Sequence, residues 1–266
     1  MFESIAMKAP HLFEFMDLDW LPVSLRNTLR EILECGNARP FRPYYDWAAN
    51  VIAEEAKESG VKHVVELGAG TAPLGRRLAR NESLTTQIFI CDRNPDLDVY
   101  RELARCYPSK IKAIEEPVDF SEPGTWPEGT LLALSGTLHH LPPEPRRQAL
   151  RAMAQSADRV LVVEPLRKTP LSMAFVVFSL VPAILLPLWF IGRPGRIRRL
   201  VWCWVLPAAP LIFLWDGWIS CIREWSDEEF RDEVAKIPGI TCKASHTLFC
   251  QSILLAKKDG LPSSGG

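Results

Sequence analysis

The sequence has almost no net charge and no compact grouping of cysteines. Its 266 residues contain 31 Lys and Arg against 32 Asp and Glu, which gives a formal net charge of -1. We therefore expect no nucleic acid partner, because such partners are usually held by a basic surface. The 7 cysteines form no CxxC pair and are odd in number. This pattern predicts reduced thiols in a cytoplasmic-facing protein and no metal site.

The amino terminus also lacks the basic start and the continuous apolar core of a signal peptide. Acidic residues interrupt its apolar residues, among them Glu3, Glu14 and Asp17. We expect this segment to be retained and residues 1–60 to form a helical accessory segment. With 47% hydrophobic residues, the chain can bury one large core together with a small accessory element.

From Val61 onward, strand-like apolar runs alternate with helical patterns. The runs 62–67, 87–92, 131–135 and 159–165 are separated by helical patterns such as 73–80 and 142–157. This alternation predicts an α/β fold with a doubly wound, mostly parallel sheet. In such sheets, ligands bind at the carboxyl ends of the strands.

A glycine-containing turn follows the first predicted strand, in the stretch VVELGAGTAPLGRR (64–77). Gly68 and Gly70 permit a sharp turn and the close approach of a ligand, and a helix that begins near Pro73 directs free N–H groups to the same place. A dinucleotide-binding fingerprint would need a glycine at position 73, where this chain has proline. The turn therefore favours a nucleotide-type ligand other than NAD.

Four elements in order resemble the class I S-adenosylmethionine-dependent methyltransferases. They are the ExGxG turn that starts at Glu66, Asp92 at the end of the second strand, Asp119 in PVDF, and LSGTLHHLP (134–142). The resemblance covers about residues 40–165 and 222–257. It implies a seven-stranded sheet, S-adenosylmethionine as the cofactor, and methyl transfer as the reaction.

The resemblance also implies a set of cofactor contacts. The turn would line the methionine part of the cofactor, Asp92 would accept the ribose hydroxyls, and Arg93 with Asp119 and the following phenylalanine would surround the adenine. Glu66 would orient the turn or the methionine amine. The implied cofactor-binding residues are Glu66, Gly68, Ala69, Gly70, Asp92, Arg93, Asp119, Phe120 and Ser135.

One position of the turn departs from the family pattern. Many members have glycine where this chain has Ala72. The extra methyl group is tolerable if the backbone there stays in an ordinary conformation.

Candidate catalytic residues follow the fourth predicted strand. His139 and His140 lie at the ligand-facing edge, and an imidazole suits the removal of a proton near neutral pH. Each of them is a candidate base. The alternative is that they cap or pack, since the family often has two histidines here without using either as a base.

Three further residues are candidate substrate contacts. Tyr44 and Tyr45 belong to an N-terminal segment that, in the resembled family, often forms part of the substrate wall, although core packing is the first interpretation of both residues. Glu164 ends the fifth predicted strand and could contact an acceptor. An ion pair with Arg167 or Lys168 is the simpler interpretation of Glu164.

The largest departure from the family is a long apolar insert. Leu171–Gly192 and Leu200–Trp215 contain no charged residue, and each approaches the length of about 20 residues that spans a bilayer. Between them lie four arginines, at 193, 196, 198 and 199. Because the chain must return to the same sheet, we predict a re-entrant or interfacial hairpin with its arginines among lipid phosphates. A two-span hairpin is the second interpretation, and core helices are the third.

The sequence thus predicts a membrane-associated enzyme whose catalytic domain faces the cytoplasm. Its expected reaction is methyl transfer to a lipophilic small molecule or lipid, with membrane lipids contacted through residues 171–215. Two alternatives stay open: a soluble acceptor with the insert serving only as an anchor or homo-oligomer interface, and a non-catalytic membrane-binding module. The predicted divisions are an accessory segment (1–60), a methyltransferase domain (61–165 and 222–257), the insert (166–221) and a disordered tail (258–266).

Overall fold

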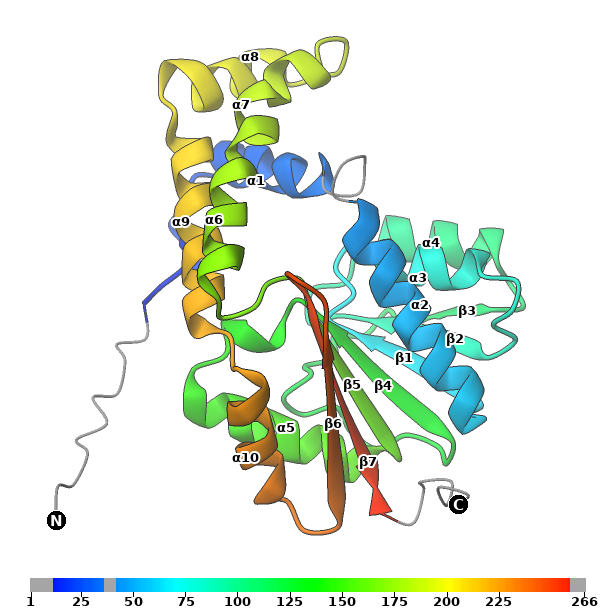
Figure 1. The fold of residues 1–266 in the computed structure, drawn as a ribbon. Helices are drawn as coiled ribbons and strands as arrows, with labels where there is room; N and C mark the ends of the chain where they lie inside the picture. Colours follow the sequence, from blue (N-terminus) through cyan, green and yellow to red (C-terminus); the bar gives the residue numbers. More distant parts are fainter. Residues whose placement is uncertain (1–11, 36–41, 259–266) are drawn as a thin grey trace, which may run out of the picture.

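A seven-stranded sheet forms the centre of the protein (Figure 1). The computed structural model describes residues 12–35 and 42–258, so nearly all of the predicted tail lies outside the described residues. The strands are β1 (His63–Leu67), β2 (Gln87–Cys91), β3 (Ile111–Ala113), β4 (Thr130–Ser135), β5 (Arg159–Glu164), β6 (Ile240–His246) and β7 (Gln251–Lys257). Their order is β3-β2-β1-β4-β5-β7-β6, and β7 is antiparallel to both of its neighbours. The predicted fold class is therefore confirmed.

Helices cover both faces of this sheet, as expected for a doubly wound fold. One face carries α2 (Arg42–Ser59), α3 (Pro73–Arg80) and α4 (Leu97–Cys106). The other carries α5 (Pro143–Ser156) and α10 (Asp227–Ala235). Each face has its own cluster of buried apolar residues, because strands covered on both sides are apolar along their whole length. The fifth strand illustrates this, since all its residues are buried.

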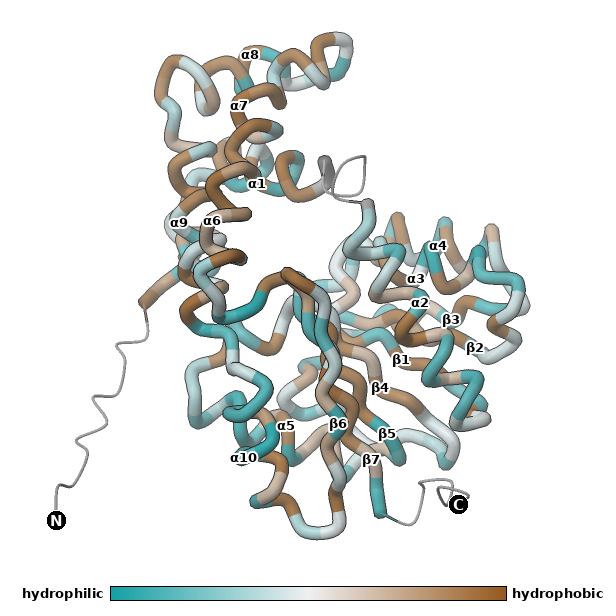
Figure 2. Tube along the Cα trace, in the orientation of Figure 1, coloured by the Kyte–Doolittle hydropathy of each residue, from teal (hydrophilic) through white to brown (hydrophobic). Residues whose placement is uncertain are grey.

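The insert projects from the end of the sheet where the parallel strands finish (Figure 1). It consists of α6 (Pro170–Phe178), α7 (Leu180–Trp189), α8 (Arg196–Leu200), a π-helical stretch (Val201–Val205) and α9 (Ala208–Arg223). Figure 2 shows that these helices are mainly hydrophobic along their length. We call residues 170–223 the helical insert; its last helix ends two residues beyond the predicted boundary at 221.

Helix α1 (Val23–Cys35) packs against the helical insert and not against the sheet. Leu25 and Leu29 of α1 belong to one buried cluster with Ala183 and Leu186 of α7. The predicted accessory segment is thus divided between two partners, because α2 belongs to the core of the sheet. The insert and α1 together form a small helical unit with its own apolar core.

The tip of the helical insert corrects one expectation from the sequence. Arg199 is fully buried, and its guanidinium donates to three backbone carbonyls of the tip loop and to Glu31 of α1. Arg198 also forms an ion pair with Glu31, at 2.6 Å. The prediction that all four arginines lie among lipid phosphates is therefore wrong for Arg199, whereas Arg198 is partly exposed and Arg193 and Arg196 are exposed.

By length and composition, one stretch of the insert could cross a membrane. It is the continuous helical run 170–189, of which 33% is buried within the protein. The second predicted run is bent by 70° between Val205 and Ala208. Proline residues explain such breaks, because each lacks an N–H and displaces the preceding turn.

Candidate active site

The turn after β1 contains three residues in the left-handed region of backbone conformation. Gly68, Gly70 and Ala72 have φ angles of 67°, 54° and 49°, and Ala72 is the only described non-glycine residue with a positive φ. The condition of an ordinary backbone conformation at Ala72 is therefore not met. A side chain in this region costs about 1–2 kcal/mol, so the turn is held in place by the structure around it.

Asp92 closes this turn from the end of β2. One carboxylate oxygen, Oδ2, accepts a hydrogen bond from Gly70 N at 2.9 Å, and Oδ1 accepts one from Asn94 N at 2.7 Å. Nothing lies within 4 Å of the position that a Cβ of Gly70 would take. The structure thus brings the predicted turn and the predicted ribose-binding acid together beside open space. Their contacts with a cofactor stay a prediction.

Glu66 is buried between the turn and α3 and does not lie in the open space beside Gly70. Its side chain is buried, and its Oε2 is only 2.7 Å from where a Cβ of Gly75 would lie. Burial raises the pKa of Glu66 to about 8, against the opposing effect of the Gly75 N–H. Gly75 was not identified from the sequence; any side chain there would collide with Glu66 and with Ile90, so this glycine allows α3 to pack closely on β1 and β2.

The predicted adenine-side residues lie near one another, with Arg93 just after β2 and with Asp119 and Phe120 after β3. Arg93 Nε is 3.8 Å from Asp119 Oδ2, and Phe120 is partly buried against the apolar cluster on the α5 face. Burial opposes ionisation of Asp119, but hydrogen bonds from Ser121 and the Arg93 charge together lower its pKa. The three residues therefore form a half-open edge that is suited to a planar group.

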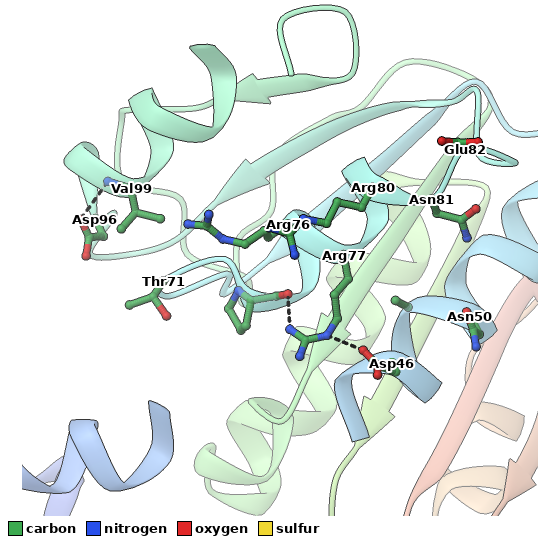
Figure 3. Close-up of a pocket in the computed structure, with 12 residues that line it drawn as sticks. Asp46, Asn50, Thr71, Arg76, Arg77, Arg80, Asn81, Glu82, Asp96 and Val99 are labelled. Carbon is green, nitrogen blue, oxygen red and sulfur yellow. Dashed lines mark hydrogen bonds and ion pairs between the residues drawn. The ribbon is translucent and has the colours of Figure 1, made fainter. Parts of the chain in front are cut away.

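A hollow on the outer side of α3 is separate from the predicted cofactor-binding residues. Figure 3 shows that arginines 76, 77 and 80 surround it. Arg77 donates to Asp46 Oδ1 at 2.8 Å, which fastens α3 to α2. None of the predicted cofactor-binding residues is among the described residues that line it.

A second cavity, with a volume of about 740 Å³, lies between the sheet and the helical insert. Its floor is formed by the ends of β4 and β5, and its walls come from α1, α2, α6, α9 and the turn between β6 and β7. Most of the wall is apolar or aromatic, including Phe175, Val176 and Phe213. His139, His140 and Ser135 lie at the floor. The cavity therefore combines an apolar volume with a few convergent polar groups, as small-molecule sites do.

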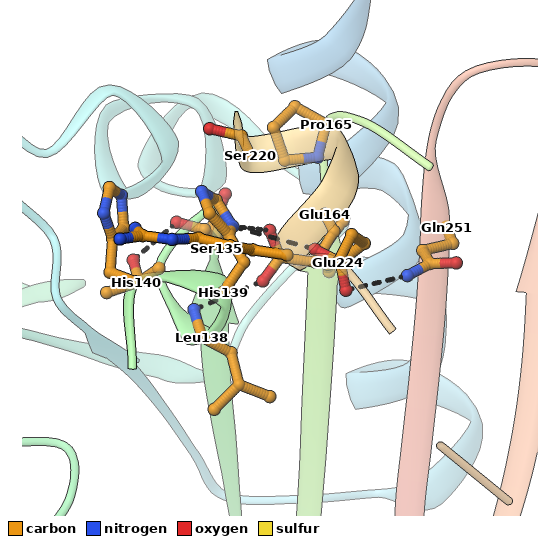
Figure 4. Close-up of polar contacts among 12 residues, drawn as sticks. Ser135, Leu138, His139, His140, Glu164, Pro165, Ser220, Glu224 and Gln251 are labelled. Atoms are coloured by element: carbon orange, nitrogen blue, oxygen red, sulfur yellow. Dashed lines mark hydrogen bonds and ion pairs between the residues drawn. The ribbon is translucent and has the colours of Figure 1, made fainter. Parts of the chain in front are cut away.

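His139 is oriented from behind by buried carboxylates (Figure 4). Its Nδ1 is 2.9 Å from Glu164 Oε2 and 3.7 Å from Glu224 Oε2. Burial, and then the charge of Glu164, raise the pKa of Glu224 well above its ordinary value. Because a carboxylate accepts, Nδ1 carries the proton and Nε2, on the opposite side of the ring, is left as the proton acceptor.

The position of Glu164 corrects two expectations from the sequence. Its carboxylate is fully buried, accepts from Leu138 N at 3.3 Å, and does not line the cavity. Its predicted ion pair with Arg167 or Lys168 is also wrong. Lys168 binds Glu229 and Arg167 lies near Asp227, because the chain turns away from the sheet after β5.

His140 contacts the N-terminal segment (residues 12–22). Its Nδ1 is 3.2 Å from Asp17 Oδ1 and 3.3 Å from Glu14 Oε2. Burial lowers the pKa of His140, but the two carboxylates outweigh it and the pKa is raised. His140 is therefore held as part of an ion-pair network, whereas His139 is held by the core of the sheet.

The residues that fix this network were not identified from the sequence. Arg146, which is buried, donates to the carbonyls of His139, Leu141 and Arg223. Arg223 of α9 in turn forms ion pairs with Glu14 and with Asp17. No local pattern marks these residues, since their partners are up to 211 positions away. These residues are recognised only in the structure, where they are charged side chains with little exposure to solvent.

The two tyrosines both line the cavity. The Tyr44 hydroxyl lies 2.7 Å from Ser135 Oγ and donates to Val163 O at 3.2 Å. The Tyr45 ring packs beneath the Arg77 guanidinium, 5.1 Å from its centroid. The two rings meet edge to face, with centroids 4.9 Å apart. Both predicted residues are thus placed at the cavity, and contact with an acceptor stays a prediction.

Two groups of side chains have the spacing of metal ligands. The ligand atoms of His139, His140 and Glu14 lie within 4.8 Å of one another, as do those of His139, Glu164 and Glu224. Their carboxylates already accept from arginine, serine, glutamine or backbone donors. We assign no metal to either group, and the predicted absence of a metal stays a prediction.

Comparisons with known proteins support the fold at low sequence identity. No protein family model matches the sequence, and no curated protein matches it either. The solved structure of the plantazolicin methyltransferase BpumL with SAH is similar with a TM-score of 0.55 and 9% identity, over 88% of this chain and 94% of that one.

Two further structures show the same architecture. A putative O-methyltransferase from Nostoc punctiforme has a TM-score of 0.52 and 15% identity, with 85% of this chain and 60% of that one covered. The magnesium protoporphyrin IX methyltransferase of Synechocystis, with bound SAH, has a TM-score of 0.51 and 12% identity, with 81% and 84% covered. The chain therefore has the fold of the class I S-adenosylmethionine-dependent methyltransferases.

Proposed function

We propose that this protein transfers a methyl group from S-adenosylmethionine to a lipophilic acceptor that enters from a membrane surface. The fold and the structural neighbours support the enzyme class, and the turn closed by Asp92 supports the cofactor. When bound, the cofactor would supply a methyl group on a positively charged sulfur. The turn at Gly68–Gly70 and Asp92 would hold it, with the Arg93 and Asp119 edge beside the adenine.

The distribution of exposed apolar side chains carries the membrane part of the proposal. Among the described residues, every exposed large hydrophobic side chain lies in residues 13–33, in residues 171–222, or at Leu248. The rest of the methyltransferase domain has none among the described residues. A large apolar surface confined to one end of a protein marks an interaction site. Because the same helices form the walls of the cavity, an acceptor could pass from lipid to cavity without crossing water.

The packing of α1 favours an interfacial insert over one that spans the bilayer. Helix α1 carries Arg26, Arg30 and Glu31, and Glu31 is tied to the two tip arginines. A two-span hairpin would carry these charges into the hydrocarbon core, where each is costly. An insert lying in the interface leaves them at the level of the headgroups, with Arg193 and Arg196 free to attract anionic lipids.

Within the cavity, we assign His139 as the general base. Positioning of the acceptor and exclusion of water supply much of the catalysis of methyl transfer. The Glu164 carboxylate keeps the proton of His139 on Nδ1, so Nε2 can take a proton from the acceptor. The Tyr44–Ser135 contact fixes the cavity floor beside it.

The membrane part can be tested by changing three exposed residues of the insert, Phe178, Trp189 and Ile197, which are 72%, 58% and 77% exposed. Replacing all three by serine should lower binding to phosphatidylcholine vesicles at least about 100-fold, because each apolar side chain contributes about 1.5–3 kcal/mol when buried. Cofactor binding, measured by calorimetry, should not change. The matched control replaces the same three residues by leucine, which keeps the apolar surface and should keep vesicle binding.

Two outcomes would contradict the proposal. If the serine variant binds vesicles like the parent, the insert is not the membrane anchor. If the serine variant becomes monomeric in ultracentrifugation while the parent is a dimer without vesicle affinity, the insert is an oligomer interface and the acceptor is soluble. Failure of the parent to bind S-adenosylmethionine would instead overturn the enzyme assignment.

A further inference from the structure

The charged side chains that line the acceptor cavity are acidic, apart from His140, whose raised pKa favours a positive charge held between Asp17 and Glu14. Glu14, Asp17 and Asp216 line it together with two histidines, and no lysine or arginine is among the described lining residues. Glu164 and Glu224 lie directly behind His139. The polar end of the cavity is thus surrounded by carboxylates.

Two arginines beside the histidines of the cavity floor are already occupied by protein groups. Arg223 donates to Glu14 Oε1 at 3.1 Å and to Leu12 O at 2.8 Å, and its side chain is only 5% exposed. Arg146 donates to backbone carbonyls and lies over the Trp225 ring, 4.9 Å from its centroid. Neither guanidinium is among the described residues that line the cavity, and His140 already faces Asp17 and Glu14, so an entering anion would compete with these carboxylates for any positive charge there.

An anionic reacting group would therefore be disfavoured at this site. It would leave water next to carboxylates, and a charge transferred from water without a partner is costly. A neutral hydroxyl has no such cost, because it can donate to His139 Nε2. The cavity also has aromatic walls on two sides, the Tyr44–Tyr45 pair and the stacked Phe175–Phe249 pair with centroids 4.5 Å apart.

On the basis of the proposed function, we infer that the acceptor is a lipophilic phenol and that the cavity rejects carboxylates and phosphates. A phenol, whose ordinary pKa is about 10, is a much better proton donor to imidazole than an aliphatic alcohol. In the reaction, the phenolic oxygen bonds to the methyl carbon as the carbon–sulfur bond breaks. The phenolic proton passes to His139 Nε2, the sulfonium becomes a neutral thioether, and the positive charge ends on the imidazolium.

The test compares three probes with the same alkyl chain: dodecylphenol, dodecanoic acid and dodecylamine. Binding to the protein loaded with S-adenosylhomocysteine is measured by calorimetry in nonionic detergent near neutral pH. Methyl incorporation from labelled S-adenosylmethionine is measured in parallel. We expect dodecylphenol to bind at least about tenfold more tightly than dodecanoate, which is about 1.4 kcal/mol, and to be methylated on oxygen.

A double variant tests the cause of the discrimination. Glu14→Gln with Asp17→Asn removes two carboxylates and leaves Arg223 without these partners, so dodecanoate should bind at least about tenfold more tightly than to the parent. The control, Glu116→Gln with Glu128→Gln, makes the same change in net charge at two exposed positions outside the cavity and should have no effect. If the double variant fails to fold, the binding of the three probes to the parent protein still tests whether the cavity prefers a phenol to a carboxylate.

The outcomes separate this inference from the proposed function. Methylation of dodecanoate or dodecylamine in preference to the phenol would overturn the phenol assignment while leaving the enzyme a methyltransferase. Cofactor binding without detectable binding of the phenol would overturn it as well. Loss of both cofactor binding and methyl transfer in the parent would overturn the proposed function instead.

Discussion

The cofactor end and the acceptor end of this protein are built in different ways. At the cofactor end, Gly68, Gly70 and Asp92 lie within residues 68–92, and the backbone N–H of Gly70 donates to the Asp92 carboxylate. At the acceptor end, Phe15 N and Met16 N donate to Asp216, about 200 residues away. The first arrangement follows from local backbone geometry. The acceptor end depends on a particular packing of segments that are distant in the sequence. Substitutions there can therefore change the ligand without changing the fold.

The largest expected effect lies at the acceptor end. His139→Asn should lower the methyl transfer rate about 10²- to 10⁴-fold, the usual contribution of a general base, because no other group takes the phenolic proton. Cofactor affinity should be unchanged. His140→Asn is the matched control and should retain most of the activity, since His140 is held by Glu14 and Asp17. The rates are measured in single turnovers. Similar losses in both variants would contradict the assignment of His139, and not His140, as the general base.

At the cofactor end, Asp92→Ala should weaken S-adenosylmethionine binding at least about tenfold, since a hydrogen bond to a charged group contributes about 1.5–3 kcal/mol. The effect has two sources: ribose hydroxyls lose an acceptor, and Gly70 N loses the carboxylate that shapes the turn. Asp98→Ala, at an exposed position of α4, is the control for charge. The affinity of both variants for S-adenosylmethionine is measured by calorimetry. Equal affinities in the two variants would mean that Asp92 does not contact the cofactor.

The difference between the two ends also explains how much could be predicted from the sequence. Alternating strands and helices, the glycine turn and the acid after β2 have local signatures, and the structure confirms the fold that they predicted. The conformation of Ala72 could not be predicted, because a left-handed backbone is imposed from outside the residue. The ion pairs of Glu14, Arg223 and Arg199 connect segments that only the tertiary structure brings together, and no spacing in the sequence encodes them.

A third prediction concerns the core behind the cofactor turn. Because burial raises the pKa of Glu66 from 4.5 to about 8, the folded protein binds a proton that the unfolded chain releases between these values. The parent should therefore lose stability as the pH rises from about 5 to about 8. Glu66→Gln imitates the protonated carboxyl. Its free energy of unfolding should therefore rise relative to that of the parent by up to about 1.4 kcal/mol per pH unit. Urea unfolding at several pH values measures this, and a constant difference would mean that Glu66 is ionised in the fold.

The smallest expected effect concerns the N-terminal segment at the acceptor end. His140 faces Asp17, Glu14, the buried Glu164 and the neighbouring His139 ring, and the acids raise its pKa above the ordinary value of 6.5. A raised pKa of this kind adds stability that is fully present below about pH 6.5 and is lost as the pH rises through the folded-state value. The pKa of Asp17 is lowered, against burial, by His140 and Arg223, so Asp17 remains ionised throughout this window.

His140→Gln should therefore lower the melting temperature more at about pH 6 than at about pH 8.5. The side chain of His140 is 36% exposed, so the ion pairs are screened and contribute about 0.5–1 kcal/mol, or a few degrees at most. In the Asp17→Asn background, the same substitution should lose most of its pH dependence, because its main charged partner is gone. If the melting temperature falls equally at both pH values, His140 acts by packing alone. The N-terminal segment would then close the acceptor cavity by shape and not by charge.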